Sequence, residues 1–420
     1  MTRKQKTNLR VQLIGALVVA CGGIVAAACS SSGDDTAAAG SNSGGTGGSG
    51  VAGGTHAGSG GTANGTGGNS AGSGGKAAGG GGTTAGGAPD QGDAGASGAP
   101  ELATFNLKQT DLDSDVDGSA QKDPNLVNAW GIAINTTAEL FWVASNHGGS
   151  VPVYDATGAI KLDPKVPPIS GTDPGNPTGQ VFNSGTNFKA DKFIVDTEDG
   201  QILGWPGTGD FVQRQKKDGA IYKGLALVGT GAAQMLVATD FHDGTVDVYD
   251  ATYQPSAQAN AFTDTTIPAG FAPFNVMPLG DSVYIAYAMQ DDDKEDDQAG
   301  PGNGYVSVFK TDGTYVKTLI SGGELNSPWA LALAPSNFGA LAGMLLVGNF
   351  GDGLVHAYDP TSGALVGQLT DTTGKPLLIP GLWDLKVGPT GTTDLSKTLF
   401  FSAGPGGEAH GIFGKLEAAQ

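Results

Sequence analysis

The sequence predicts an all-β fold: a six-bladed β-propeller, preceded by a signal peptide and a disordered linker rich in Gly, Ser and Ala. Two observations predict the propeller. Short apolar phrases that alternate like half-buried strands recur about every 50 residues between 101 and 420. Each is followed by an apolar strand, a Gly-containing corner and a strand that ends in an aromatic residue. Radially repeated four-stranded sheets suit this period, whereas the alternative, a β-helix, has much shorter coils.

Residues 1–28 are predicted to be a lipoprotein-type signal peptide. The basic stretch "MTRKQKTNLR" precedes the apolar run "VQLIGALVVACGGIVAAAC", which is short and interrupted by glycines. Cys29 ends "VAAAC" and precedes the polar "SSSGDD", which resembles a lipobox, so Cys29 is the expected lipidation site. Cys21, in "LVVAC", is the competing position, and a plain signal peptide is the other alternative.

Residues 29–100 are predicted to be a disordered, Gly-rich tether. The stretch contains no aromatic residue and almost no large apolar one, so it cannot bury enough surface to offset its chain entropy. As a flexible coil it would span roughly 45 Å. We therefore expect an exported protein of the cell envelope, anchored in the outer membrane by its lipid, or an extracellular one.

The charge and the cysteine content limit the partners and the means of stabilisation. The formal net charge is -19, so nucleic acid is not an expected partner, and membrane contact is expected only through the N-terminal lipid. The sequence has no cysteine after Cys29, so the folded part must be stable without disulfides.

The first strand of each repeat supplies the candidate ligand residues. The six phrases read "NAWGIAI", "NPTGQVF", "IYKGLAL", "APFNVMP", "SPWALAL" and "GLWDLKV". In a propeller these strands line the central channel. The expected residues at its mouth are Trp130, Lys223, Trp329 and Trp383, with Asn275 and Asp384 beside them. The aromatic residues could wall a pocket or pack neighbouring blades together. The strand "LATFNLKQTDL" is expected to complete the last blade beside "GIFGKLEA".

Two further stretches carry candidate chemistry. "MQDDDKEDDQAGPGNG" is an insertion in the fourth repeat, and its density of carboxylates suits Ca²⁺ or simply a solvated acidic loop. "GGEAHG" places Glu408 and His410 two residues apart, on one face if the stretch is a strand. That pair suits acid–base or metal chemistry, or a structural histidine. No common hydrolase or nucleotide-binding motif occurs.

The repeat phrases resemble an uncharacterised bacterial family of exported, NHL-like six-repeat propeller proteins with a lipoprotein-type signal peptide. The matching stretches include "DPNLVNAWGIA", "GPGNGYVSVF", "LNSPWALALAP", "LLVGNFGDG" and "EAHGIFG". The resemblance implies a six-repeat propeller and export, with no established activity. It also singles out Lys294, Asp296 and Asp297 in the acidic insertion, of which the two aspartates are the candidate metal ligands.

Two functions remain open at this point. The first is a lipid-tethered scaffold that binds a small ligand, a glycan or a protein on one propeller face. The second is a Ca²⁺-dependent hydrolase or lactonase, similar to the gluconolactonase-like six-bladed propellers. There Asn275, Asp384, Asn349 and Glu408 would be the nearest metal candidates. The second rests on analogy of fold, which does not fix function, so whether the chain is an enzyme stays open.

Overall fold

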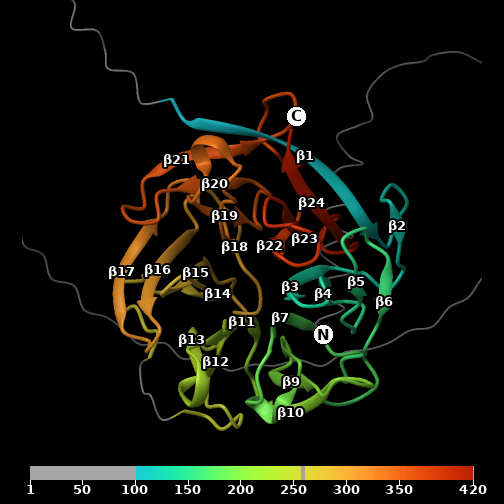
Figure 1. Cartoon of the computed structure of the whole chain (residues 1–420). Helices are drawn as coiled ribbons and strands as arrows, with labels where there is room; N and C mark the ends of the chain where they lie inside the picture. Colours follow the sequence, from blue (N-terminus) through green and yellow to red (C-terminus); the bar gives the residue numbers. More distant parts are fainter. Residues whose placement is uncertain (1–100, 257–260, 420) are drawn as a thin grey trace, which may run out of the picture. The chain divides into compact units, whose positions relative to one another are not determined.

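The computed structural model describes residues 101–256 and 261–419, which form an all-β propeller with no α-helix in those ranges. The predicted signal peptide at 1–28, the tether at 29–100 and Cys29 lie outside the described residues. Figure 1 shows the sheets arranged radially about a common centre. Three 3₁₀ turns occur besides the strands: η1 (Phe188–Ala190), η2 (Gly231–Ala233) and η3 (Gly339–Leu341).

The strands pair into five hydrogen-bonded sheets in the described part of the chain. Four are simple runs: β3 (Ala129–Asn135), β4 (Leu140–Ser145), β5 (Val153–Tyr154) and β6 (Ile160–Leu162); β7 (Pro177–Phe182), β8 (Phe193–Thr197), β9 (Gln201–Trp205) and β10 (Val212–Lys216); β11 (Tyr222–Val228), β12 (Met235–Asp240) and β13 (Thr245–Tyr249); β14 (Phe271–Leu279), β15 (Ser282–Met289), β16 (Gly304–Lys310) and β17 (Tyr315–Ser321).

The fifth sheet has nine strands, because β1 joins two runs. One run is β18 (Pro328–Leu333), β19 (Leu345–Asn349), β20 (Val355–Tyr358) and β21 (Leu365–Thr370); the other is β24 (Ile412–Ala418), β23 (Leu399–Ala403) and β22 (Leu382–Val387), while β2 (Gln121–Lys122) pairs with β1 (Ala103–Ser114). The six repeat phrases coincide with β3, β7, β11, β14, β18 and β22, which lie toward the centre in Figure 1. The count of six blades stays a prediction.

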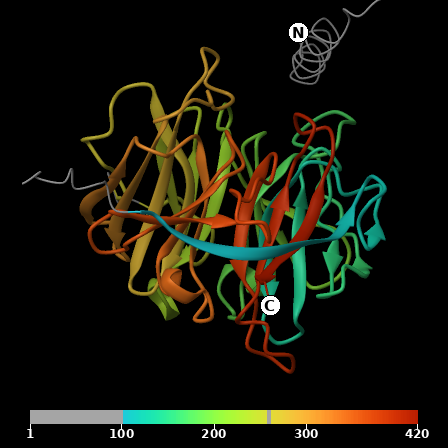
Figure 2. The ribbon, with the colours of Figure 1, turned by 90° about the horizontal axis from the view of Figure 1, so that it is seen from above.

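Strand β1 closes the ring. Its second part pairs antiparallel with β24 from Leu107 to Ser114, which confirms the predicted pairing of the two chain ends. Its first part, from Ala103 to Asn106, pairs in parallel with β21, which the sequence did not predict. In Figure 2 this strand crosses the side of the ring between the two runs. One strand therefore links two neighbouring sheets by backbone hydrogen bonds.

The hydrophobic core is divided into layers between adjacent sheets. Strand β19 is buried at all five positions, whereas the outer strand β10 has no buried position. The difference arises because an inner strand is covered on both faces by its neighbours, while an outer strand meets solvent as the sheets splay apart. Apolar residues of the inner strands consequently form near-continuous runs, which is the pattern that the sequence displays.

Glycines let the inner strands approach one another closely. A Cβ atom on Gly179 would lie 2.3 Å from the backbone nitrogen of Leu225. A Cβ on Gly224 would lie 2.4 Å from Oδ1 of Asn275. Neither position tolerates a side chain without movement of the neighbouring strand. The inner strands β7, β11 and β14 therefore pack closely against one another at these two glycines.

Candidate functional site

Three tryptophans form a buried aromatic floor at the centre of the ring. Trp130 on β3, Trp329 on β18 and Trp383 on β22 are each at most 2% exposed. Trp130 and Trp383 stack with ring centroids 3.5 Å apart, and Trp329 meets both edge-on at 6.3 and 6.0 Å. Phe241, Phe274 and Phe350 belong to the same cluster. The rings therefore pack against one another, as the packing alternative proposed, and do not present open faces to a ligand.

Lys223 on β11 extends over this floor as a buried cation. Its Nζ lies 2.6 Å from Oε1 of Glu198, just after β8, and 3.3 Å from Oδ1 of Asp296. The same Nζ lies 5.1 Å from the centroid of Trp130. The side chains of Lys223 and Glu198 are only 2% and 5% exposed, whereas Asp296 is 43% exposed. A buried charge is tolerable only when paired in this way, and the aromatic face adds a favourable cation–π contact.

A chain of hydrogen bonds connects the floor to this ion pair. Trp383 Nε1 donates to Oδ1 of Asn128 at 3.0 Å, and Asn128 Nδ2 donates to Oδ1 of Asn146 at 3.3 Å. Asn146 Nδ2 then donates to Oε2 of Glu198 at 3.1 Å. Both oxygens of Glu198 are thus engaged by residues from different sheets. The network holds the carboxylate in place for Lys223.

The charge of Lys223 also acts on two further carboxyl groups, which belong to separate loops. Burial, followed by the charges of Asp296 and Glu198, raises the pKa of Glu408 to about 8, and Lys223 opposes the shift. Burial also raises the pKa of Asp297 to about 6, against the lowering effects of Ser327 and Lys223. Glu408 is nevertheless partly open to solvent at its surface. Its carboxyl makes no hydrogen bond or ion pair within residues 101–256 and 261–419.

One buried polar atom at this site, Nε1 of Trp130, has no hydrogen-bond partner among the described residues. Ser327 is fully buried, and its hydroxyl lowers the pKa of Asp297 by hydrogen bonding to that carboxyl group. Unpaired buried polar atoms are costly, and natural proteins keep them mainly where they have a role.

The backbone around the site is strained. Ser327 and Glu408 have φ angles of 49° and 67°, and Asn128 and Lys294 have 52° and 59°. This left-handed region is unfavourable for residues other than glycine, although asparagine tolerates it better. Of these residues, Asn128 belongs to the hydrogen-bond chain that reaches Glu198, and Glu408 interacts electrostatically with the ion pair. Strain of this kind persists only where the surrounding structure fixes it, and it concentrates at functional sites.

The remaining predicted residues brace the ring or lie apart. Asn275 Nδ2 donates to the carbonyl of Trp329 at 2.7 Å, and Asp384 Oδ2 accepts from the backbone N–H of Ile132 at 2.8 Å. Both therefore tie neighbouring inner strands together. Asn349, named for the calcium alternative, likewise donates through Nδ2 to the carbonyl of Glu324 at 2.8 Å.

Glu408 and His410 do not form a pair on a strand. They lie in the turn between β23 and β24, so the conditional expectation of a shared strand face does not apply. His410 Nδ1 instead lies 2.9 Å from Oδ2 of Asp115. Glu408 faces the Lys223 ion pair, and the backbone carbonyl of Glu408 is 3.0 Å from Nδ1 of His147.

The acidic insertion does connect β15 to β16, and it brings Asp296 and Asp297 to Lys223. No group of three or more His, Cys, Asp or Glu side chains is arranged to hold a metal ion in the part of the chain that the structure describes. The metal assignment to these two aspartates stays a prediction.

The sequence analysis missed Glu198 and Asn146, although a signal for them exists. Each stands one residue after the second strand of its repeat, in "FWVASN" and "FIVDTE". The corresponding position of the fifth repeat is Phe350, in "LLVGNF". Aligning the residues that follow the second strand of each repeat, as the first strands were aligned, would have singled out Glu198 as a carboxylate in the repeat before that of Lys223.

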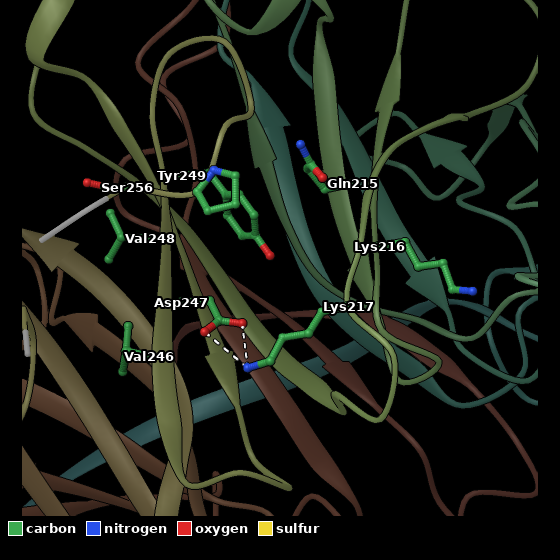
Figure 3. A pocket seen from close by; sticks show the side chains of 9 residues that line it. Gln215, Lys216, Lys217, Val246, Asp247, Val248, Tyr249 and Ser256 are labelled. Carbon is green, nitrogen blue, oxygen red and sulfur yellow. Dashed lines mark hydrogen bonds and ion pairs between the residues drawn. The ribbon is translucent and has the colours of Figure 1, made fainter. Parts of the chain in front are cut away.

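A separate cleft lies at the outer edge of the ring, between β10 and β13. It has a volume of about 310 Å³, and its lining includes Gln215, Lys217, Asp247 and Tyr249. Figure 3 shows Lys217 paired with Asp247, at 3.0 Å. Lys217 also bonds Asp240 at 2.8 Å. The polar groups here satisfy one another, so this cleft is the weaker candidate.

No helix among the described residues is long and apolar enough to cross a membrane.

Comparison with known proteins identifies relatives of the chain and solved structures that align with it. No protein-family model matches the chain. Two uncharacterized proteins of Acanthamoeba polyphaga mimivirus are 30% and 31% identical to it over 319 and 321 residues, which covers 71% of this chain in each case and 76% and 82% of the viral proteins. Among solved structures, the Dos1 propeller aligns with a TM-score of 0.42 at 11% identity, covering 70% of this chain and 69% of that one. The Neurospora crassa Pan2 WD40 domain aligns with a TM-score of 0.45 at 12% identity, covering 75% and 97%.

These relatives correct one expectation. The resemblance to a bacterial family of NHL-like proteins is wrong, because the relatives found are uncharacterized proteins of a giant virus. Short phrases such as "SPWALAL" reflect the constraints on any inner propeller strand, so they do not distinguish one propeller family from another.

Proposed function

The chain belongs to the family of these two uncharacterized mimivirus proteins, and from that premise we propose that it is an exported, lipid-anchored β-propeller that binds a small polar ligand. The binding site is the cluster of Lys223, Glu198, Asp296, Asp297 and Glu408 over the tryptophan floor. The protein acts at the cell envelope and does not bind nucleic acid.

The buried ion pair of Lys223 is the single observation that carries the binding proposal. Burying a lysine and a glutamate together is often no better for stability than burying two apolar residues. Here the pair also sits beside the unpaired buried Nε1 of Trp130 and a left-handed backbone at Glu408. A purely structural ion pair needs neither feature. A polar ligand that accepts a hydrogen bond from Nε1 of Trp130 would account for both features.

The calcium-dependent hydrolase remains the alternative, but its proposed ligands are engaged elsewhere. Asn275 and Asp384 bond backbone groups of neighbouring strands, and Asn349 bonds the carbonyl of Glu324 in the loop before β18. Of the four candidates only Glu408 faces the cluster. The geometry therefore favours binding through Lys223.

A ligand-observed NMR screen with the full chain tests the binding proposal. Pools of neutral polyols, small carboxylates and small amines are compared for the wild type and Asp296→Asn. Asp292→Asn is the matched control, because Asp292 is an exposed acid of the same insertion. We expect at least one class to bind and to weaken with Asp296→Asn alone. Absence of binding in every class, or equal binding by both variants, would refute the proposed site.

The lipid anchor is tested separately by fractionating cells. The proposal rests on the basic start, the apolar run and the position of Cys29 before a polar stretch. Cys29→Ser should release the protein from membranes, whereas Cys21→Ser, the matched control, should leave it bound. Retention of the Cys29 variant would show that the anchor is elsewhere or absent.

A further inference from the structure

We propose that a second ligand site lies between the fourth and fifth repeats, where Tyr358 binds the hydroxyl group of a small neutral alcohol. The site is a cavity of about 270 Å³, lined by β17 on one side and by β20 and β21 on the other. No residue of the Lys223 cluster lines it. This inference goes beyond the proposed function and does not rest on it.

The hydroxyl group of Tyr358 is a buried polar atom that has no hydrogen-bond partner among the described residues. Tyr358 is 3% exposed and forms part of the cavity wall. Burial, followed by the charges of Glu324 and Asp352, raises its pKa above the ordinary value, so the hydroxyl stays protonated and can both donate and accept. A buried hydroxyl without a partner costs stability, and a ligand that bonds it from the cavity would offset that cost.

The equivalent positions of the other repeats show that this hydroxyl does not serve packing. Two repeats end the same strand with phenylalanine, at Phe309 and Phe413, which has no polar atom. The other polar side chains at this position have partners within the protein: Tyr154 donates to Asp123 at 2.9 Å, Trp205 donates to the carbonyl of Gly209 at 2.8 Å, and Tyr249 shares a hydrogen bond with Tyr222 at 2.7 Å. Packing therefore requires only an aromatic ring here, and the hydroxyl of Tyr358 is the exception.

A second buried polar side chain, His356, lies on the same face of β20. It precedes Tyr358 by two residues, so both side chains enter the layer between the two sheets. Its Nδ1 has no partner among the described residues, and its Nε2 lies 4.0 Å from Oε2 of Glu324, which is too far for a hydrogen bond. Burial lowers the pKa of His356 against the opposing charges of Glu324 and Asp352, so its ring is neutral at pH 7. The buried polar groups on this face are therefore uncharged.

The walls of the cavity favour a neutral ligand with an aliphatic frame. Leu319, Ile320 and Leu365 supply apolar surface, and the charged residue of the lining is Glu324, whose side chain is 59% exposed. A carboxylate ligand would meet the like charge of Glu324. An ammonium group would lose hydration against three aliphatic side chains and gain only a solvated carboxylate. A hydroxyl group donates and accepts as Tyr358 does, and the volume, just below the range of about 300–1,000 Å³ for ligand pockets, suits a small molecule.

The test measures binding of cyclohexanol to the full chain by ligand-observed NMR. Cyclohexylamine and cyclohexanecarboxylate, which carry the same ring and opposite charges, are the comparison ligands. We expect cyclohexanol to bind more tightly than either. Tyr358→Phe should weaken its binding about three- to tenfold, which is the effect of losing one neutral hydrogen bond. Tyr154→Phe is the matched control, because it removes the equivalent hydroxyl of another repeat, and it should leave the affinity unchanged.

Urea unfolding of the same variants separates a ligand site from a structural hydroxyl. Tyr358→Phe should unfold at the wild-type midpoint or above it, whereas Tyr154→Phe should unfold earlier, because Asp123 loses a hydrogen bond. Ser321→Trp, at an exposed position of the cavity lining, should abolish binding and replaces Tyr358→Phe if that variant fails to fold.

Several results would overturn the inference: no binding of cyclohexanol, equal binding of the three ligands, unchanged affinity in Tyr358→Phe or Ser321→Trp, or a Tyr358→Phe variant as destabilised as Tyr154→Phe. Loss of cyclohexanol binding in Asp296→Asn would also overturn it, since the alcohol would then bind at the Lys223 cluster.

Discussion

Replacing Lys223 with methionine tests the ion pair at the centre of the site. Methionine keeps most of the length of the side chain and removes the charge, so buried Glu198 loses its contact with the Lys223 ammonium group at 2.6 Å. Both partners are at most 5% exposed, so solvent screening does not reduce the effect. Breaking one partner of a buried pair costs about 3–5 kcal/mol. The contact with Asp296, which is 43% exposed, adds less than about 1 kcal/mol.

The assay is urea unfolding followed by tryptophan fluorescence, because three tryptophans lie beneath Lys223. The double variant Lys223→Met/Glu198→Gln removes both charges and keeps an acceptor for the amide of Asn146. We expect the double variant to recover most of the loss and to unfold within about 1–2 kcal/mol of the wild type. A single variant within about 1 kcal/mol of the wild type, or a double variant as unstable as the single one, would refute the reasoning.

The other predictions concern the seam, a second ion pair and pH. Deleting residues 101–106 removes the parallel pairing of β1 with β21. In urea unfolding, the free energy of unfolding should fall by about 2–4 kcal/mol. An unchanged unfolding midpoint would contradict this. Arg214 contacts the fully buried carboxylate of Asp191 at 2.6 and 2.7 Å, so Arg214→Leu leaves that carboxylate without its cation. The variant should lower the free energy of unfolding by about 3–5 kcal/mol. A melting temperature equal to that of the wild type would contradict this. Because the pKa of Glu408 is raised to about 8, the folded state keeps a proton that the unfolded state releases near pH 4. The melting temperature should therefore fall as pH rises from about 5 to 9. Glu408→Gln should flatten the upper part of this profile, and a variant profile parallel to that of the wild type would contradict the raised pKa.

The sequence predicted the propeller and its seam because both depend on local patterns. The inner strands are buried on both faces, so their apolar character repeats with each sheet, and β1 and β24 alternate in a matching way. The parallel pairing of β1 with β21 had no such signal, since the unpaired backbone groups of an edge strand can bond a further strand whatever its side chains are.

The candidate site was only partly predictable, because its contacts join residues that are far apart in the chain. Trp130, Trp329 and Trp383 occupy equivalent positions in the first strand of their repeats, so their contact could be predicted. Lys223 lies in the first strand of its repeat and Glu198 follows the second strand of another, while Glu408 lies in a turn. The length of the side chains across the channel decides such contacts, and the repeat pattern of the sequence does not reveal them.

The position of β1 has a mechanical consequence. Any pull on the segment before Ala103 enters the ring at the strand that joins its two ends. The four residue pairs between β1 and β21 would carry that load first, and the pairs between β1 and β24 next. If the protein is anchored at its N-terminus, shear at the surface would thus act on the closure of the ring before it reached Lys223. Peeling of the first few residues would dissipate force while the central cluster kept its geometry.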